Sequence, residues 1–423
     1  MLSNIFTHKT LQNGIDLYIC PTNKFKTISI YFFLHQNLKS ETATKTALLP
    51  YVLKRGTEKF TTSRSISLFL DDLYGSGMGG DILKRGETQI VSFFMDMVHP
   101  KYVEDQDIFD KAMLVFADMI LHPVKEDGGF KKDYVNQEKD VLKRNIESLY
   151  NDKFNYAIER CFQEMCKDEA YSIYKYGNIE DLDGINNKNL YEYYTDCLKS
   201  CPIDIFVMGD VNEQEITDKI EKQFYFERGK VIEVGTGFSK KEVKQERFVE
   251  ERQNLNQGKL SMGFRTKTRY GDDDYYALMV YNGILGGGTH SKLFSNVREK
   301  ASLAYYAFSR IEKAKGLMVV SCGIEFDDMQ KTIDIIKKQL DDIRQGEITD
   351  YEYESTIKSL TNSLKEVQDS PSSIISMYLD GIINGIHEPV EDMIYKLKKV
   401  TKRDVVEVAH KIDLDTIFFL NKK

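Results

Sequence analysis

A chain of 423 residues is longer than a single ordinary hydrophobic core supports, so it predicts two or more domains of about 100 to 200 residues each. Hydrophobic residues make up 41% of the chain and charged residues 29%, which is typical of a folded globular protein and excludes a disordered one. The net charge of −8 argues against a nucleic-acid partner, because a phosphate backbone calls for a basic face.

The expected location is the cytoplasm. The N-terminal segment Met1–Thr10 shows no basic region followed by an apolar core, so neither a secretory signal nor a transit peptide is indicated. No apolar run reaches the length of about 18 residues that a transmembrane helix needs. The six cysteines contain no Cys-x-x-Cys pair and are interpreted as free thiols rather than as a disulfide or metal set.

The N-terminal half begins with an alternating strand at 15–19 and a longer apolar strand at 27–34. A helix containing Ala47 follows, then a second helix at 63–74 and a hairpin whose turn is at Gly86. Helical patterns cover 103–121, 131–150, 155–166 and 190–198, and a strand at 203–207 closes the half.

The second half repeats this order, which indicates two copies of one unit. Its strands are expected at 259–264, 303–309, 317–322 and 416–420, and its helices at 273–285, 291–300, 328–343, 351–367, 373–384, 390–400 and 403–410. The predicted fold is therefore α+β, with two tandem domains that each pack helices on one face of a mostly antiparallel sheet. The predicted domains are 1–227 and 247–423, joined by a Gly-, Lys- and Glu-rich linker at 228–246.

The first helix carries the most informative stretch, from Ala47 to Thr57, which ends in Val-Leu-Lys-Arg-Gly-Thr. It resembles the active-site helix of the pitrilysin and mitochondrial processing peptidase family, whose His-x-x-Glu-His binds zinc and supplies the general base. In this register the two His positions hold Ala47 and Tyr51, and the Glu position holds Pro50. Ala47 has no ligand atom, Pro50 has no carboxylate, and Tyr51 is a poor zinc ligand at neutral pH. No catalytic residue is expected here.

A second segment is similar to the same family on the helix that contains Glu138. The resemblance places the third zinc ligand at Asn145, which again cannot replace a carboxylate. It also implies that Glu138 occupies the position of a residue that supports the zinc site. The alternative is that Glu138 is a solvated glutamate on the helix surface.

A replacement metal site is not indicated by the histidines. The seven histidines are spread along the chain, and no two of them stand one helix turn apart. We therefore expect no metal and no cofactor in this chain, and expect zinc only in an active partner.

The best preserved stretch is in the second half, where a triple glycine leads into Ser-x-Leu-Phe-x-x-x-Arg-Glu-Lys-x-x-Leu-Ala-Tyr. It is not a phosphate-binding loop, because no Gly-Lys-Ser/Thr comes after it. The resemblance implies that Arg298 and Tyr305 correspond to the pair that holds substrate carbonyls and supports the oxyanion. The alternative is that Arg298 forms a salt bridge or caps its helix while Tyr305 packs on the strand.

Two functions of different classes are consistent with these residues and the resemblance. In the first, the chain is an inactive, substrate-contacting subunit that pairs with an active, zinc-containing relative and processes peptides or small proteins. In the second, it is a non-enzymatic peptide-binding or scaffold homodimer. An active peptidase with an unrecognised site is the third and weakest alternative.

Overall fold

The computed structural model describes residues 5–423, so the first four residues of the predicted N-terminal domain lie outside the described part. The described chain divides into two compact units. The first contains the chain up to Glu147, with Ile173–Gly235 and Pro371–Ser376. The second contains Ser148–Ser172, Thr236–Ser370 and Met377–Lys423. The domain boundaries at residues 228 and 246 remain a prediction.

The first unit is built on a six-stranded sheet with the order β1-β2-β8-β3-β5-β4. Neighbouring strands are antiparallel except β2 and β8, which are parallel. The buried alternating residues of β3, which include Ile30, Phe32 and Leu34, face the core. The strands are β1 (Thr7–Thr10), β2 (Asp16–Pro21), β3 (Thr27–Asn37), β4 (Gly77–Arg85), β5 (Thr88–Val98) and β8 (Ile203–Gly209).

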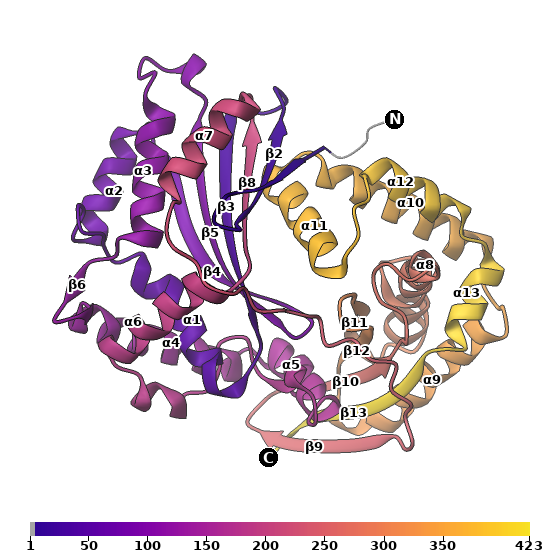
Figure 1. Cartoon of the computed structure of the whole chain (residues 1–423). Coiled ribbons are helices and arrows are strands. Elements are labelled where there is room, and N and C mark those ends of the chain that lie inside the picture. The colour runs from indigo at the N-terminus through magenta and orange to yellow at the C-terminus, as the bar shows by residue number, and fades with distance from the viewer. Residues whose placement is uncertain (1–4) are drawn as a thin grey trace. The chain divides into compact units, whose positions relative to one another are not determined.

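Helices of the first unit pack their apolar stripes against this sheet, and Figure 1 shows α2 and α3 beside it. Two of these helices begin at a capping box, made by Thr62 before α2 and by Asn186 before α6. The helices are α1 (Ser40–Leu53), α2 (Ser63–Asp72), α3 (Ile108–Leu121), α4 (Lys132–Asn151), α6 (Asn187–Ser200) and α7 (Glu213–Gln223), and the short strands β6 (Lys125–Glu126) and β7 (Gly129–Phe130) pair with each other.

The second unit repeats the topology of the first. Its sheet has the order β11-β12-β10-β13-β9, in which only β13 and β9 are parallel. Read from the parallel pair, β9-β13-β10-β12-β11 matches β2-β8-β3-β5-β4 strand for strand. The strands are β9 (Arg247–Gln253), β10 (Gly258–Arg265), β11 (Ala304–Glu312), β12 (Leu317–Ile324) and β13 (Asp413–Lys422).

Both faces of the second sheet are covered by helices of the same unit. On one face, α5 (Lys153–Met165) packs against β10 and β13 and buries Cys161 and Phe162. On the other face, apolar residues such as Leu278, Ile336 and Leu397 form the main core with β10 and β12. The other helices are α8 (Tyr275–Gly286), α9 (Met329–Arg344), α10 (Asp350–Val367), α12 (Val390–Lys399) and α13 (Lys402–Ala409), together with the part of α11 (Pro371–Asn384) from Met377 onward.

The structure confirms the predicted α+β fold and departs from the predicted elements at a few places. The strands β1 and β9 and the helix α7 were not predicted, because their few buried residues give weak periodicity. The predicted α-helix at 291–300 is instead a π-helix over Phe294–Lys300, and the helix predicted from 103 begins at Ile108. Within residues 5–423, no helix is both long and apolar enough to cross a membrane.

Candidate functional site: a replaced zinc centre and an exposed Arg/Tyr pair

The helix α1 places the three degenerate motif positions against the first sheet. It begins at Ser40 and continues through Pro50, although proline cannot donate the helical hydrogen bond to the carbonyl four residues earlier. Ala47 and Pro50 are fully buried, while Tyr51 is half-buried. Two of the three positions have therefore become packing residues of the core.

The structure brings Tyr51 and Asn145 together, as the resemblance implies for two ligand positions. The Asn145 amide on α4 donates to the Tyr51 hydroxyl at 3.0 Å. Burial is the main cause that raises the pKa of Tyr51, and the nearby Asp81 adds to it, so the phenol stays protonated at neutral pH. A neutral phenol and an amide do not fit zinc, which binds thiolate, imidazole and carboxylate.

The hydrogen-bonded set extends from Tyr51 to the strand β4. The Tyr51 hydroxyl also hydrogen-bonds to the phenol of Tyr176. Tyr176 in turn donates to the carboxylate of Asp81 on β4 at 3.2 Å. Asn145, Tyr51, Tyr176 and Asp81 thus link α4, α1 and β4 through polar groups that satisfy one another, and we call these four residues the tyrosine network.

Glu138 is neither solvated nor aimed at a metal. It is 6% exposed, and its carboxylate lies 3.2 Å from the Arg55 guanidinium, which stacks on the ring of Tyr134 at 4.8 Å. Burial raises the pKa of Glu138, and the charges of Arg55 and Lys54 oppose that shift. The alternative prediction of a surface glutamate is therefore wrong, because Glu138 has become half of a buried ion pair.

Away from the replaced zinc centre, too, the described chain contains no group of side chains that could bind a metal ion. Within residues 5–423, no three His, Cys, Asp or Glu side chains are grouped so that they could hold a metal ion. The buried side chains of His35 and Asp204 lie 2.7 Å apart and join β3 to β8. Among the described residues, no third His, Cys, Asp or Glu is grouped with this pair so that a metal ion could be held.

Arg298 and Tyr305 lie at the two ends of an irregular segment in the second unit. Arg298 is exposed on the π-helix, and its guanidinium lies 4.8 Å from the centre of the Phe294 ring. Between them, Ser302 has a φ of +52°, a conformation that non-glycine residues seldom adopt. Both π-helical turns and such backbone conformations are common at functional sites.

Tyr305 owes its exposure to a β-bulge at the start of β11. Ala304 pairs with Ile324 and Tyr306 with Gly323, so Tyr305 is the extra residue between them. Its side chain is 78% exposed, the largest value among the exposed large hydrophobic residues of the described chain. Tyr306 beside it is half-buried and packs on Phe154. Tyr305 therefore does not pack on the strand, as the alternative prediction required.

The triple glycine before this segment has a structural reason. A Cβ at Gly286 would stand 2.3 Å from the backbone nitrogen of Ser309, so only glycine allows α8 to end against β11. After the turn, Lys292 is 6% exposed and its ammonium lies 3.0 Å from Glu352 on α10. Gly286 thus allows α8 to lie against β11, the strand that carries Tyr305.

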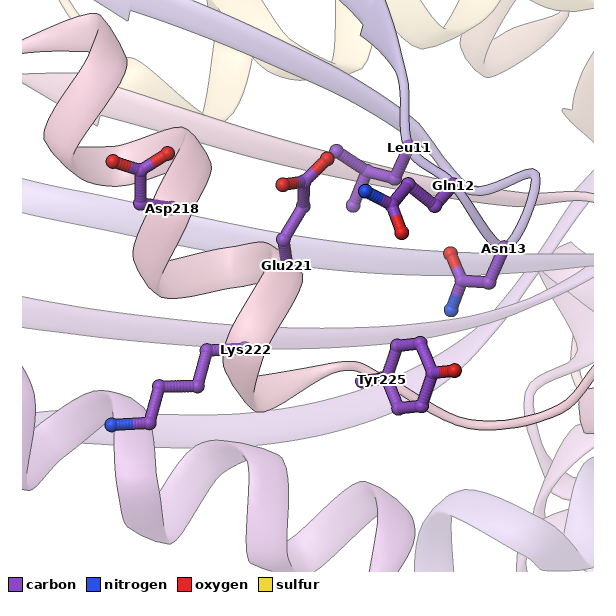
Figure 2. A pocket seen from close by; sticks show the side chains of 7 residues that line it. All are labelled: Leu11, Gln12, Asn13, Asp218, Glu221, Lys222 and Tyr225. Atoms are coloured by element: carbon purple, nitrogen blue, oxygen red, sulfur yellow. The ribbon is translucent and has the colours of Figure 1, made fainter.

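A separate pocket of about 480 Å³ lies in the first unit, between the turn after β1 and the end of α7 (Figure 2). Leu11 and the carboxylate residues Asp218 and Glu221 line it, and Lys222 extends away from the other labelled side chains. None of the site residues predicted from the sequence lines it. This hollow therefore gives no support to the predicted site.

Comparison with known proteins identifies relatives with a metallopeptidase fold. Residues 184–360 match the family model described as the peptidase M16 inactive domain. The probable inactive metalloprotease YmfF of Bacillus subtilis is 36% identical over 413 residues, which cover 97% of each chain. A conserved protein from Enterococcus faecalis, known from its crystal structure, is 31% identical, with a TM-score of 0.92 over 99% of each chain.

A more distant relative is named for a biosynthetic role. The antilisterial bacteriocin subtilosin biosynthesis protein AlbE of Bacillus subtilis is 23% identical over 315 residues, which cover 74% of this chain and 76% of that protein. The fold and the replaced ligands define a chain of the inactive metallopeptidase class. This chain belongs to the M16 peptidase family, the pitrilysin and processing peptidase family that its motifs resemble, as a homologue of its inactive members.

Proposed function

We propose that this chain is the non-catalytic, peptide-contacting subunit of a zinc peptidase complex that processes peptides or small proteins. An active M16 partner supplies the zinc and the general base, and this chain supplies Arg298 and Tyr305. The observation that carries the proposal is the contrast between a replaced metal centre and a 78% exposed tyrosine on a bulge.

The chemistry of the pair supports this role. A guanidinium offers several N–H donors in a planar fork, and a phenol offers one O–H, so both can donate to the carbonyl oxygens of an extended peptide. Because the side chain of Tyr305 is 78% exposed, its phenol can meet another molecule without any rearrangement of the core. The name of AlbE, a bacteriocin biosynthesis protein, favours a peptide as that molecule.

The test begins with the native complex. A tagged chain is purified from its own cells under mild conditions, and the expected companion is an M16 protein with an intact His-x-x-Glu-His motif. Peptide cleavage by the pair should be abolished by a chelator and restored by zinc. Recovery of the chain only with copies of itself would favour the scaffold homodimer instead, and chelator-sensitive cleavage by the chain alone would exclude both functions.

The second step assigns the residues. In the reconstituted pair, Arg298→Ala and Tyr305→Ala should each lower kcat/KM by about tenfold or more, as expected when a donor to the reacting peptide is lost. Matched controls are Arg310→Ala, an exposed arginine on β11, and Tyr351→Ala, a tyrosine that is 69% exposed. Unchanged turnover in both site variants would remove the contact role while leaving the pairing itself intact.

A further inference from the structure

The strand β4 is the last strand of the first sheet, so one of its edges has no strand neighbour in that sheet. Such an edge presents backbone N–H and C=O groups that can pair with an extended segment of another chain. Because antiparallel strands alternate in the direction of their backbone groups, the carbonyls of Gly80, Ile82 and Lys84 all point the same way. Whether these carbonyls are free decides whether another chain can pair with this edge.

Each of these three carbonyls accepts a hydrogen bond from a basic side chain. Lys54 donates to Gly80 at 2.7 Å, Lys175 donates to Ile82 at 3.2 Å, and the Arg85 guanidinium donates to the Lys84 carbonyl at 3.1 Å. Carbonyls that are bonded to side chains in this way point away from β5, outward from the free edge of the sheet. We call Lys54, Lys175 and Arg85 the edge clamp.

Two members of the edge clamp are held in place by aromatic rings of the tyrosine network. The Lys54 ammonium lies 5.3 Å from the centre of the Tyr51 ring, and the Lys175 ammonium lies 4.4 Å from that of Tyr176. Asp81, between the two capped carbonyls, accepts from Tyr176. The clamp and the network that replaces the zinc ligands are therefore one continuous structure.

We propose that the edge clamp closes the edge of β4 to strand addition, so that an extended peptide does not pair with this strand. A pairing peptide would have to replace hydrogen bonds from charged donors, which are about twice as strong as neutral ones. It would also have to move a lysine that is already packed on a ring. Covering an edge strand with a helix or a loop is a common protection against unwanted pairing, and Lys54 follows the end of α1 while Lys175 lies in a turn.

The test uses an uncharged twelve-residue peptide of alternating Thr and Gln, which can extend as a strand, and follows backbone amide exchange at Gly80 and Ile82. In the unaltered chain the peptide should change these exchange rates by less than about twofold. In a Lys54→Met/Lys175→Met variant, saturating peptide should slow them by about tenfold or more, because the outward N–H groups then acquire partners.

Control variants separate closure of the edge from general effects. Lys39→Met removes an exposed lysine just before α1 and should leave the exchange rates as in the unaltered chain. Lys175→Met alone keeps Lys54 on Tyr51 and should give an intermediate response even if the double variant fails to fold. The proposal is wrong if the peptide protects β4 equally in the unaltered chain, or if folded clamp variants gain no protection.

Discussion

The strands β4 and β11 occupy equivalent places in the two units, yet their surroundings differ. Each is the terminal strand of its sheet, next to β5 and β12 respectively. In the first unit, Lys54 and Lys175 cap the carbonyls of β4. In the second unit, β11 begins with a bulge that exposes Tyr305. In one unit the carbonyls of the terminal strand are bonded to side chains of the same unit, and in the other the terminal strand exposes a tyrosine.

The difference shows how a packed site adjusts when its metal centre is lost. Buried polar groups need partners, so the positions left by zinc ligands must either become apolar or bond to one another. At the ligand positions, Ala47 is apolar, while Tyr51 and Asn145 bond to each other; Pro50, at the position of the general base, is also buried.

The largest expected effect comes from the buried charges of the second unit, which support the sheet that carries β11. Glu169 is 6% exposed at its side chain and contacts Arg265 at 2.7 Å and Lys315 at 2.8 Å. Glu169→Gln would remove the negative charge that Arg265 and Lys315 share, while Asp415 would still pair with Arg265 at 3.0 Å. The change should lower the free energy of unfolding by about 3 kcal/mol in urea denaturation. Glu164→Gln, in a half-buried pair with Arg160, should cost about 1 kcal/mol or less.

The same variant should change the dependence of stability on pH. Burial raises the pKa of Glu169, but hydrogen bonds from Arg265, Lys315 and Lys241 outweigh it and lower the pKa to about 2. Because the pKa is lower in the folded chain than in the unfolded one, this stabilisation is complete above the unfolded value of 4.5 and is lost as the pH falls towards 2. The slope of stability between these pH values should be smaller in Glu169→Gln; an unchanged slope would contradict the assignment.

A smaller effect is expected from a change within β4 itself. A Cβ at Gly80 would lie 2.4 Å from the Phe93 ring and 2.8 Å from the Ser92 carbonyl oxygen. Gly80→Ala should therefore lower the free energy of unfolding by about 1–3 kcal/mol through overpacking, measured by urea denaturation. Gly77→Ala in the same strand meets no atom within 4 Å and should change it by about 0.5 kcal/mol or less. Equal costs in the two variants would refute the packing argument.

Much of this fold could be predicted from hydrophobic periodicity, and the missed elements show where that signal fails. The strand β9 alternates Arg, Glu and Gln with only two apolar residues, and α7 buries little beyond Ile216 and Ile220. Their places are determined by partners distant in sequence, because β9 pairs with the C-terminal strand β13.

The candidate site also has residues that the sequence could predict and residues that it could not. Motif resemblance located Tyr51, Asn145, Arg298 and Tyr305, because each has a fixed distance to recognisable neighbours. It could not locate Tyr176 or Lys175, since their contacts with α1 and β4 arise only on folding. Nor does the sequence mark the bulge, because an extra residue is defined only against the strand it pairs with.

The smallest expected effect distinguishes the exposed tyrosine from its neighbour. Tyr305→Ala removes a side chain that is 78% exposed and should change the free energy of unfolding by about 0.5 kcal/mol or less. Tyr306→Ala, one residue further, removes a ring that packs on Phe154 and Phe308 and should cost about 3 kcal/mol. Urea denaturation of both variants measures the contrast. If Tyr305→Ala were as costly as Tyr306→Ala, Tyr305 would be a structural residue of β11. A lower turnover of the Tyr305→Ala variant in a complex could then not be ascribed to a missing peptide contact.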